Sequence, residues 1–558
     1  MITLVERAAV WARSTPDQAA YTYVDHTHEP DGIRHTLTWA QVDTRTRALA
    51  ARIRRHTDPG ERVAVLAPQG LDYITAFLGA CYAQVIAVPL FTPDLPAHGE
   101  RLLHSFNDSA PAAVLTTSAA LPHVEAFLGG GGVAEPADLI CVDEVGDVLA
   151  AQFQAEPIRP HDPAYLQYAS GPTSSPAGVV ISHANLTANA DQIWTAFEAR
   201  PGDTALVSWL PLFHDMGLML TVLAPLTHGD LALFTDPVAF LMRPARWLEL
   251  AASCERDVYT AGPNFAYDYC AKHITEDEKR ALDLSRLRVC MNGAEPIRPA
   301  TVRLFAETFA ACGLRPEAPT PVYGLAEAVV FVATAPTGDL AVTTVSDAEA
   351  LGLGRAVKAE ATARSVELVA CGRPEGQRIT IVDPETGLAL DPGHVGEIHV
   401  SGPNVAAAYW RAPQRSEDTF GGDGLLRTGD LGVMYDDQLY ITGRLKDLVI
   451  LDGRNHYPQD IEATVHTAHP GVRPGRAVAF SVPGTETELL VIVIEYAGDD
   501  GPETVVREVR SAVKARHDLR ADDIVLTAPG GVSRTSSGKL ARRATRHDYL
   551  TGALPPYA

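Results

Sequence analysis

Short, continuous apolar runs that alternate with longer helical patterns constrain the fold of this chain most strongly. The runs are RVAVLAP, VIAVPL, AAVLTTS, ADLICVDE, ALVSWLPL and LALFT. Strands without polar alternation are typical of parallel sheets that are buried on both faces, and helices form the crossovers between such strands. The chain is therefore predicted to have an α/β fold with helices packed on parallel sheets.

The pattern changes towards the C-terminus. Between about residues 375 and 442, the segments RITIVDPETGLAL, GEIHVSG and QLYITG alternate apolar and polar residues, and turn signals such as Asp436-Asp437 separate them. This texture predicts a small, more antiparallel, barrel-like subdomain. Beyond it, DLVILDG, AVAFSVPG and ELLVIVIEYAG predict strands mixed with helices, which indicates a small α+β C-terminal domain.

Residues 338–370 fit neither pattern, because they are polar, rich in alanine and only weakly periodic. Such a composition is typical of an insertion in an otherwise complete fold. An ordinary surface helix and loop would have the same composition, so both interpretations stay open.

Charge and cysteine content limit the function classes. The chain has 558 residues with 69 acidic and 46 basic side chains, a net charge of −23. Such a surface repels a phosphate backbone, so no nucleic-acid partner is expected, although a local nest of donors can still bind a nucleotide. The seven cysteines are scattered without a C-x-x-C pair, and MITLVERAAVWARS carries Glu6 and Arg7 within its apolar stretch. These features favour a cytoplasmic protein without a disulfide framework, zinc cluster or secretory signal.

One uncharged run, Tyr73 to Pro93, is long enough to cross a bilayer. Gln84 and Pro89 interrupt it, so it is better interpreted as a buried helix (LDYITAFLGACYAQ) followed by a buried strand (VIAVPL). No stable membrane insertion is expected.

A loop of small residues follows one predicted strand. Its sequence, YLQYASGPTSSPAG, precedes the strand VVISH. Backbone N–H groups and hydroxyls of such a loop can wrap around phosphate, although most Ser/Gly/Pro loops are simply turns. No G-K-[ST] closes it, so it is not a Walker loop. Its candidate phosphate-binding residues are Ser170, Gly171, Thr173, Ser174 and Gly178.

Further motifs follow other predicted strands. SWLPLFHDMG places His214 and Asp215 after an apolar strand, where the histidine can be a gate, a base or merely a capped core residue. VCMNGAEPI is a strand that ends in Asn-Gly before a potential helix start, and its backbone can receive a flat ring. PVYGLAEA offers Tyr323 as a stacking face, with Glu327 four residues later on the same side of an expected helix. A carboxylate there can hold Mg²⁺, which prefers one or two protein carboxylates plus substrate phosphates.

Charged residues near the C-terminus complete the set. RTGDLG supplies Asp430, which can accept both ribose hydroxyls, and ITGRLKD supplies Arg444 and Lys446. SRTSSGKLARR holds Lys539 in a small Ser/Gly loop, for which a solvated basic tail is the alternative interpretation.

In this order and spacing, the motifs closely resemble the adenylate-forming superfamily of acyl-CoA synthetases, peptide-synthetase adenylation domains and luciferases, over nearly the whole chain. The segments that resemble its fatty acyl-AMP ligase branch are SWLPLFHDMGLM, GPNFAYDYC, NGAEPI, YGLAEA, CGRPEGQRITIVDPETG and GRLKDLVILDGRNHYPQDIEATV, of which GRNHYPQDIE is the most specific. Residues 338–370 fall where that branch carries its distinguishing insertion, a feature associated with the lack of productive coenzyme A transfer.

The resemblance implies an N-terminal adenylation core of residues 1–442 and a mobile C-terminal domain of residues 443–558, hinged near Lys446. It also implies a reaction: a carboxylate, as in a fatty acid, attacks the α-phosphorus of ATP, pyrophosphate leaves, and the acyl-adenylate passes its acyl group to the thiol of an acyl carrier protein. ATP and Mg²⁺ are the implied cofactors.

By match to the family motifs, Lys539 would bind the carboxylate and the developing charge on phosphorus, and His214 would line the junction of nucleotide and acyl tunnel. Glu327 would hold Mg²⁺, Asp430 the ribose, and Arg444 the ribose or phosphate. Asp215 would be structural. The residues that would contact adenine are Gly293, Ala294, Glu295, Tyr323 and Gly324.

One departure from the family pattern stands out. The phosphate loop of the superfamily usually ends Ser/Thr-Gly-x-Pro-Lys-Gly, whereas here Ala177 replaces the lysine and Pro172 replaces a usual serine. This loss is expected to weaken ATP binding or slow closure without abolishing the chemistry.

Three alternatives stay open: a coenzyme A ligase, the adenylation of an unusual acid such as an aromatic carboxylate or nitrite, and a catalytically silent nucleotide-binding relative. The acid is equally open, because Met216, Leu218 and Met219 can line an apolar tunnel or simply fill a buried helix.

Overall fold

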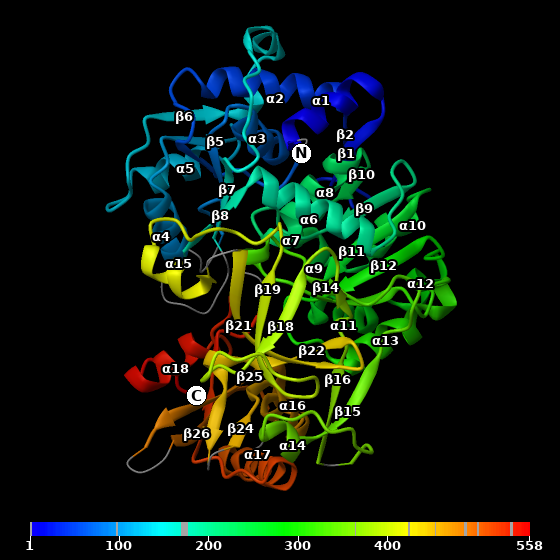
Figure 1. Cartoon of the computed structure of the whole chain (residues 1–558), viewed down its shortest axis with the longest axis vertical. Coiled ribbons are helices and arrows are strands. Elements are labelled where there is room, and N and C mark those ends of the chain that lie inside the picture. Colours follow the sequence, from blue (N-terminus) through cyan, green and yellow to red (C-terminus); the bar gives the residue numbers. More distant parts are fainter. Residues whose placement is uncertain are drawn as a thin grey trace.

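The structure is a computed structural model, and it describes residues 3–95, 99–168, 177–362, 364–421, 424–451, 454–484, 488–498, 501–535 and 539–557. Within these residues the chain forms two large sheets, a smaller antiparallel sheet and a C-terminal α+β unit (Figure 1). The predicted α/β architecture is confirmed.

The larger sheet has nine strands, and a parallel centre runs from β1 to β13. The apolar runs ALVSWLPL and LALFT form two of its inner strands, as their lack of polar alternation predicts. In spatial order the strands are β17 (Arg373–Pro374), β14 (Ala333–Thr334), β13 (Pro319–Tyr323), β12 (Leu287–Asn292), β11 (Asp257–Gly262), β9 (Thr204–Ser208), β10 (Leu231–Phe234), β1 (Ala19–Asp25) and β2 (Ile33–Thr38).

The second sheet has six strands, and all its neighbours are parallel except the last pair. That antiparallel pair lies on either side of the small-residue loop in the sequence, so the strand after the loop runs back along the strand before it. The order is β6 (Asp138–Cys141), β5 (Ala113–Thr116), β3 (Arg62–Val65), β4 (Ile86–Pro89), β7 (Pro163–Tyr168) and β8 (Gly178–Ser182).

The segment after residue 375 forms the antiparallel sheet that its alternation predicts. Asp436 and Asp437 both have positive φ angles, 49° and 58°, as a tight two-residue hairpin turn requires. The strands are β18 (Arg378–Val382), β19 (Gly396–Ser401), β20 (Phe420–Gly421), β21 (Leu425–Tyr435) and β22 (Gln438–Arg444).

The segment of residues 338–370 forms an antiparallel pair of strands, β15 (Thr343–Asp347) and β16 (Ser365–Val369), with a short helix α14 (Ala348–Gly352) between them. Leu351 of α14 is buried beside Tyr457, whose hydroxyl donates a hydrogen bond to its carbonyl oxygen at 3.4 Å. The segment therefore packs directly against the C-terminal part of the chain.

The C-terminal unit has its own core. The hairpin β23 (Val449–Leu451) and β24 (Arg454–His456) precedes a three-stranded sheet of β25 (Val472–Pro483), β26 (Glu488–Tyr496) and β27 (Asp523–Thr527). One face of α17 is buried against this sheet through valines spaced four residues apart, 505, 509 and 513. The helices are α16 (Pro458–Ala468), α17 (Pro502–His517) and α18 (Arg542–Thr551). The buried apolar residues of this unit form a cluster that is separate from the main core of the preceding sheets.

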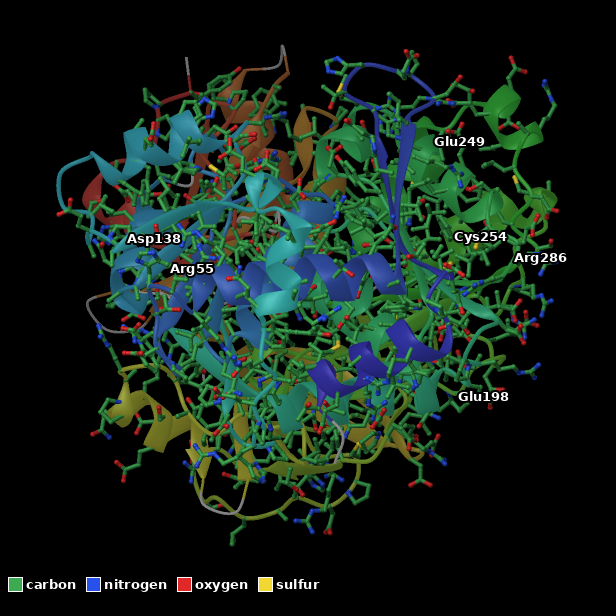
Figure 2. The ribbon with its side chains drawn as sticks, turned by 90° about the horizontal axis from the view of Figure 1, so that it is seen from above. Arg55, Asp138, Glu198, Glu249, Cys254 and Arg286 are labelled. Carbon is green, nitrogen blue, oxygen red and sulfur yellow. The ribbon has the colours of Figure 1, made fainter. Side chains whose placement is uncertain are left out.

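Helices cover both large sheets, and several begin with a side-chain cap in which Thr or Ser and a residue three positions later bond each other's backbone. Seen from above in Figure 2, α2 crosses the N-terminal region, with Arg55 and Asp138 near one end and Cys254 and Arg286 on the far side. The helices that precede the C-terminal unit, apart from α14, are α1 (Leu4–Ser14), α2 (Trp39–Ile53), α3 (Leu71–Tyr82), α4 (Gly99–Ser109), α5 (Leu121–Leu128), α6 (His183–Ala196), α7 (Asp215–Leu218), α8 (Ala224–His228), α9 (Pro237–Met242), α10 (Ala245–Ala252), α11 (Asn264–His273), α12 (Glu276–Arg280), α13 (Pro299–Phe309) and α15 (Pro413–Thr419).

The uncharged run that begins at Tyr73 is a buried helix, α3, followed by the buried strand β4, as predicted. Among the described residues, no helix combines the length and apolar character that a bilayer crossing requires.

Candidate functional site

One large cavity, of about 1750 Å³, lies where the N-terminal sheets, the antiparallel sheet and the C-terminal unit meet. Its wall contains most of the described residues that the motifs single out. These are His214, Ala294, Glu295, Tyr323, Gly324, Glu327, Asp430, Arg444, Lys446 and Lys539.

The HDMG segment is fixed by close packing. A Cβ atom on Gly217 would lie 2.0 Å from the carbonyl oxygen of Pro211, so only glycine permits this fold of the chain. At the start of α7, the Met216 N–H donates to Oδ1 of Asp215 at 2.7 Å and lies 3.4 Å from Nδ1 of His214, and that Nδ1 lies 2.6 Å from the same carboxylate oxygen. His214 and Asp215 are thereby held at the cavity wall, each with about one-sixth of its side chain exposed (15% and 16%).

The segment after β12 turns sharply at the cavity. Ala294 has φ of 70°, in the left-handed region, and Gly293 packs so closely on Val322 that an added Cβ would lie 2.6 Å from a methyl carbon. The helix expected to begin here starts only at Pro299, so an irregular segment separates it from β12. Ala294 and Glu295 line it, whereas Gly293 shapes the turn behind them.

The prediction that one helix carries both Tyr323 and Glu327 is wrong. Tyr323 ends strand β13, and Glu327 lies in a single 3₁₀ turn, Ala326–Ala328. Gly324 causes the difference, because its Cα passes so close to the chain that an added Cβ would lie 1.6 Å from the carbonyl oxygen of Val330. Both residues nevertheless line the same cavity.

A strained turn follows Glu327. Val329 has φ 68° and ψ −66°, and the N–H of Val330 donates to the carbonyl oxygen of Ala328 at 2.9 Å, which defines a γ-turn. A β-branched residue rarely adopts positive φ, and such strain persists where the surroundings enforce it. Here the side-chain amide of Asn189 holds Phe331, which follows the turn. It accepts the Phe331 N–H at 3.0 Å and donates to the Phe331 carbonyl oxygen at 2.8 Å.

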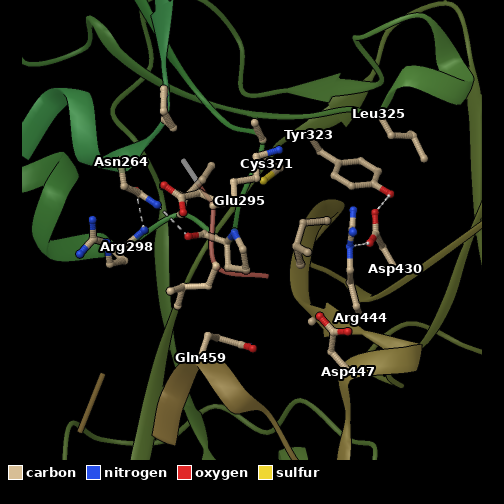
Figure 3. A pocket seen from close by; sticks show the side chains of 18 of the residues that line it. Asn264, Glu295, Arg298, Tyr323, Leu325, Cys371, Asp430, Arg444, Asp447 and Gln459 are labelled. Atoms are coloured by element: carbon tan, nitrogen blue, oxygen red, sulfur yellow. Dashed lines mark hydrogen bonds and ion pairs between the residues drawn. The ribbon is translucent and has the colours of Figure 1, made fainter. Parts of the chain in front are cut away.

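Asp430 joins two other candidate residues (Figure 3). Its Oδ2 accepts a hydrogen bond from the Tyr323 hydroxyl at 2.9 Å, and its Oδ1 accepts one from Nε of Arg444 at 2.8 Å. Register sets the second contact, because Asp430 and Arg444 are cross-strand partners in β21 and β22. Asp430 raises the pKa of the Arg444 guanidinium, and burial raises the pKa of the Tyr323 hydroxyl.

Glu327 has one oxygen engaged. Its Oε1 accepts a hydrogen bond from the Tyr409 hydroxyl at 2.6 Å, and its Oε2 accepts none from a described residue. Tyr409 in turn lies beside the strand that follows the small-residue loop, since the Val180 N–H donates to the carbonyl oxygen of Ala408 at 3.0 Å. No cluster of three or more His, Cys, Asp or Glu side chains suited to a metal occurs among the described residues. A single carboxylate is nevertheless compatible with Mg²⁺ that takes most of its ligands from substrate phosphates.

Lys539 reaches the cavity from a loop of the C-terminal unit. The Thr535 N–H donates to the carbonyl oxygen of Lys539 at 2.8 Å, and the Lys539 N–H donates to Oγ1 of Thr535 at 3.1 Å, so the loop closes on itself. Burial lowers the pKa of the half-buried Lys539 ammonium, and Asp215 opposes that effect most strongly.

A buried carboxylate fixes the base of the lysine loop. Oε1 of Glu495, whose side chain is fully buried, accepts the N–H groups of Gly530 and Val532 at 3.0 and 3.2 Å. Its Oε2 pairs with Arg473 at 2.7 Å. The backbone that leads to Lys539 is therefore anchored to strand β26.

Most of the predicted phosphate loop lies outside the described residues, including Ser170, Gly171, Thr173 and Ser174. Ala177 lines the cavity, and Gly178 starts β8 with its Cα against the Tyr168 ring, where a Cβ would lie 3.0 Å away.

Part of the cavity wall is apolar. Met216 and Leu220 come from the helical turns after Asp215, and Phe331 follows the strained turn. The apolar side chains concerned are Ile193, Met216, Leu220, Met291, Val330 and Phe331. Of the methionine and leucine residues whose role was open, Met216 lines the cavity, whereas Leu218 and Met219 are buried and do not.

Motif reasoning missed the side chains that hold the site from a distance. Tyr409 lies 82 residues from Glu327, and Asn189 lies 142 residues from Phe331, so no local spacing links either pair. Arg542 likewise ties the C-terminal unit together by bonding Glu462 at 2.7 Å and Asp447, next to Lys446, at 3.3 Å. The only available signal was the presence of polar residues inside otherwise apolar segments.

Comparison with known families agrees with this geometry. Residues 8–410 match the family described as AMP-binding enzyme, and residues 446–558 match the one described as Disco-interacting protein 2-like, AMP domain. The chain belongs to the AMP-binding enzyme family.

Similar proteins place this AMP-binding enzyme in the fatty acyl-AMP ligase branch. It is 41% identical to the long-chain-fatty-acid–AMP ligase FadD32 of Mycolicibacterium smegmatis, covering 99% of this chain and 95% of that protein. It is also 41% identical to a 4-hydroxyphenylalkanoate adenylyltransferase of Mycobacterium tuberculosis, covering 97% and 90% of the two chains.

Solved structures of this branch share the fold. The fatty acyl-adenylate ligase from Legionella pneumophila, solved in complex with acyl adenylate and pyrophosphate, is 34% identical with a TM-score of 0.76 and covers 99% of this chain and 96% of its own. A structure from work on fatty acyl-adenylate ligases of Escherichia coli and L. pneumophila is 31% identical with a TM-score of 0.86, covering 99% and 98%. The family resemblance and the adenylate-forming fold expected from the motifs are confirmed.

Proposed function

We propose that this fatty acyl-AMP ligase adenylates a fatty or aryl-substituted fatty acid with ATP and passes the acyl group to the thiol of an acyl carrier protein. The observation that carries this proposal is one cavity whose wall holds Lys539 of the C-terminal unit, the Tyr323–Asp430–Arg444 group and a set of apolar side chains. Such a cavity offers polar groups for a nucleotide and an apolar wall for the tail of a fatty acid.

Lys539 would bind the substrate carboxylate and the negative charge that develops at the α-phosphorus. Adenylation depends on positioning and charge neutralisation more than on proton transfer, because carboxylate is already a nucleophile and pyrophosphate leaves as an anion. The lysine supports this role by lying in the cavity rather than in a solvated tail. His214 would separate the nucleotide from the acyl chain.

The nucleotide would lie against the turn after β12 and the end of β13. Ala294, Glu295, Tyr323 and Gly324 would contact adenine, with Gly293 shaping the turn. Both oxygens of Asp430 keep a second lone pair after bonding Tyr323 and Arg444, so they can still accept the two ribose hydroxyls.

Glu327 would hold Mg²⁺ through Oε2, while Tyr409 orients the carboxylate through Oε1. Bound there, Mg²⁺ would neutralise phosphate charge. The phosphate loop, with Ser170, Gly171, Thr173, Ser174 and Gly178, would supply the remaining phosphate contacts.

The transfer step would use the mobility of the C-terminal unit. We place the boundary between residues 442 and 443, with the hinge at Lys446, which is exposed within the 3₁₀ turn Leu445–Asp447. The separate core of residues beyond 449 supports this division. Residues 338–370 would act as the insertion of the ligase branch, and α14 supports this by packing on Tyr457.

The names of similar proteins narrow the acid. One relative is described as acting on long-chain fatty acids and another on 4-hydroxyphenylalkanoates, so an apolar chain with or without a terminal phenol ring is the first class to test.

The experiment is pyrophosphate release with Mg-ATP across short, medium and long fatty acids, arylalkanoic acids, aromatic acids and nitrite, each paired with Lys539→Ala. Release that one acid class supports, and that falls about 10²–10³-fold in the alanine variant, is the expected result. ATP binding without pyrophosphate release for every acid would instead establish a silent nucleotide-binding relative.

A second assay separates the acceptors. The adenylate formed with the best acid is offered to a phosphopantetheinylated carrier protein and to coenzyme A. Transfer to the carrier alone supports the proposal, whereas equal transfer to coenzyme A would make the protein a coenzyme A ligase.

A further inference from the structure

The segment expected to contact the phosphates of ATP carries no basic side chain. Residues 169–178 read ASGPTSSPAG, so this stretch offers only backbone N–H groups and hydroxyls. The β- and γ-phosphates carry most of the negative charge of ATP, and sites that cleave it neutralise that charge with Mg²⁺ together with Lys or Arg side chains. A cation for these phosphates would have to come from another element of the chain.

The chain just before α15 runs beside β8, the strand that follows this loop. The Trp410 N–H donates to the carbonyl oxygen of Gly178 at 2.7 Å. The preceding residue, Tyr409, is the antiparallel bridge partner of Val179. Its hydroxyl donates to Oε1 of Glu327 at 2.6 Å. Tyr409 therefore connects the end of the phosphate loop with the carboxylate proposed to hold Mg²⁺.

Arg415, in the first turn of α15, lies on the ring of this tyrosine. Its Cζ atom is 4.3 Å from the centre of the Tyr409 ring. The hydroxyl of Ser416 accepts the Tyr409 N–H at 2.9 Å and donates to the carbonyl oxygen of Ala412 at 2.7 Å, so the helix is fixed to the tyrosine. Arg415 is half-buried and lines the cavity, as Ala177 does.

This stacking uses the face of the guanidinium and not its N–H groups. All five N–H bonds of an arginine side chain lie in the plane of the group, so its edge can still bind a phosphate through two parallel hydrogen bonds. Arg415 and Glu327 contact the same tyrosine, one at the ring and the other at the hydroxyl. A phosphate bound through Mg²⁺ at Glu327 would therefore be close to the arginine as well.

Other arginines near this strand do not lie on the cavity wall. Arg411 and Arg62 lie over the ring of Trp410, at 5.7 and 5.4 Å from its centre. Arg101 donates to the last carbonyl oxygen of β7 at 3.3 Å. None of these three lines the cavity where the structure describes it, whereas Arg415 does.

We propose that Arg415 is an ATP-binding residue that holds the β- and γ-phosphates, and the pyrophosphate they become, in place of a cation in the phosphate loop. This inference rests on the proposed function, in which ATP is cleaved to pyrophosphate in this cavity. The acyl-adenylate keeps only the α-phosphate, so the arginine holds the leaving group and not the product. Its removal must therefore affect ATP and pyrophosphate but not AMP.

The test is equilibrium binding of Mg-ATP, Mg-pyrophosphate and AMP to the full chain by titration calorimetry, with Arg415→Gln. Binding of the first two should weaken about ten- to a hundredfold and that of AMP should change less than about twofold, since only charged hydrogen bonds to the terminal phosphates are lost. Arg415→Lys, which keeps the charge but not the two parallel bonds, should lose less. Equal weakening of all three ligands would show a packing role, and unchanged binding of ATP would show that no contact exists; either result overturns the inference.

Arg411→Gln is the matched control. It removes the same charge from a neighbouring aromatic ring, outside the cavity wall. Binding of all three ligands should match that of the unmodified protein. A loss of ATP binding as large as that in Arg415→Gln would mean that the general charge of this region acts, and would reject a specific contact.

Adding Ala177→Lys to Arg415→Gln tests whether one cation can replace the other. The lysine should improve Mg-ATP binding more in the Arg415→Gln protein than in the unmodified protein, because side chains that share a partner do not act additively. The same improvement in both would show that the two positions do not serve the same phosphates. Binding needs no acid, so these ATP effects in a protein that releases no pyrophosphate with any acid would reject the proposed function alone.

Discussion

Ala177 is the residue at which the site departs most plainly from the superfamily pattern. It lines the cavity next to Gly178, at the end of the phosphate loop. Replacing Ala177 with Lys should lower the KM for ATP, because it adds a cation where the β- and γ-phosphates are expected. Pyrophosphate release against ATP concentration measures the effect, with Ala177→Gln as the uncharged control of similar length. An unchanged or higher KM in the lysine variant would contradict this account of the loop.

Tyr409 and Glu327 give a second prediction at the residue scale. Tyr409→Phe removes the 2.6 Å hydrogen bond to Oε1 and leaves the ring in place, so the carboxylate loses its orientation. The Mg²⁺ concentration for half-maximal pyrophosphate release should rise about 10–100-fold, the usual cost of losing a partner of a metal ligand. Phe420 packs on the Tyr409 ring at a centroid distance of 5.1 Å, so Phe420→Leu serves as the packing control. An equal Mg²⁺ shift in both variants would argue that packing, not the hydroxyl, matters.

At the scale of elements, continuous apolar strands and turn signals were sufficient to predict the sheets, since burial on both faces leaves a strong local pattern. The same local reasoning failed at Tyr323–Glu327, where a four-residue spacing suggested a helix. A Cβ atom at Gly324 would lie 1.6 Å from the carbonyl oxygen of Val330. This close contact with a residue six positions later prevents the helix, and the spacing of Tyr323 and Glu327 gives no sign of it. Motif order predicted a set of residues, most of which line one cavity where they are described, but the pairs Asp430–Arg444 and Tyr409–Glu327 depend on strand register and distant contacts that spacing does not encode.

The anchoring of the lysine loop to β26 is testable at this scale. Glu495→Gln keeps the shape but removes the charge that pairs at 2.7 Å with Arg473, whose side chain is 39% exposed. Losing a charged hydrogen-bond partner costs about 1.5–3 kcal/mol, so the C-terminal unit should unfold at a lower urea concentration. Adenylation should fall less, because the glutamine Oε1 can still accept the N–H groups of Gly530 and Val532.

Glu488→Gln on the same strand is exposed and provides the control for that experiment. Its urea midpoint should stay within the error of the unmodified protein. Equal midpoints for the Glu495 and Glu488 variants would show that the pair does not support the loop.

At the scale of the whole molecule, the main core of the N-terminal sheets and a separate cluster in the C-terminal unit both lie beside the shared cavity. Residues 446–558 carry 14 basic and 15 acidic side chains, so nearly all of the net charge of −23 belongs to the rest of the chain. Separate cores and unequal charge predict two calorimetric transitions for the free protein, the lower one belonging to the C-terminal unit.

A non-hydrolysable acyl-adenylate analogue should raise the lower transition and bring the two together, since it binds only when both walls of the cavity are folded. At one hundred times its Kd such a ligand contributes about 2.7 kcal/mol. Scanning calorimetry with and without the analogue measures this, and Lys539→Ala should reduce the shift. A single transition that the analogue leaves unchanged would show that the two cores unfold as one body independent of the cavity.

The shared wall also has a chemical consequence. An acyl-adenylate is a mixed anhydride that water destroys, and the cavity proposed to hold it is lined by both the N-terminal part and the C-terminal unit. With the proposed mobility of that unit, the lysine loop would shield the anhydride while it stays in place, and water and the acceptor thiol would gain access together when the two parts separate. The fraction of activated acid lost to hydrolysis would then be set by how quickly the thiol arrives, so the ATP spent per acyl group transferred would depend on the partner as well as on the active site.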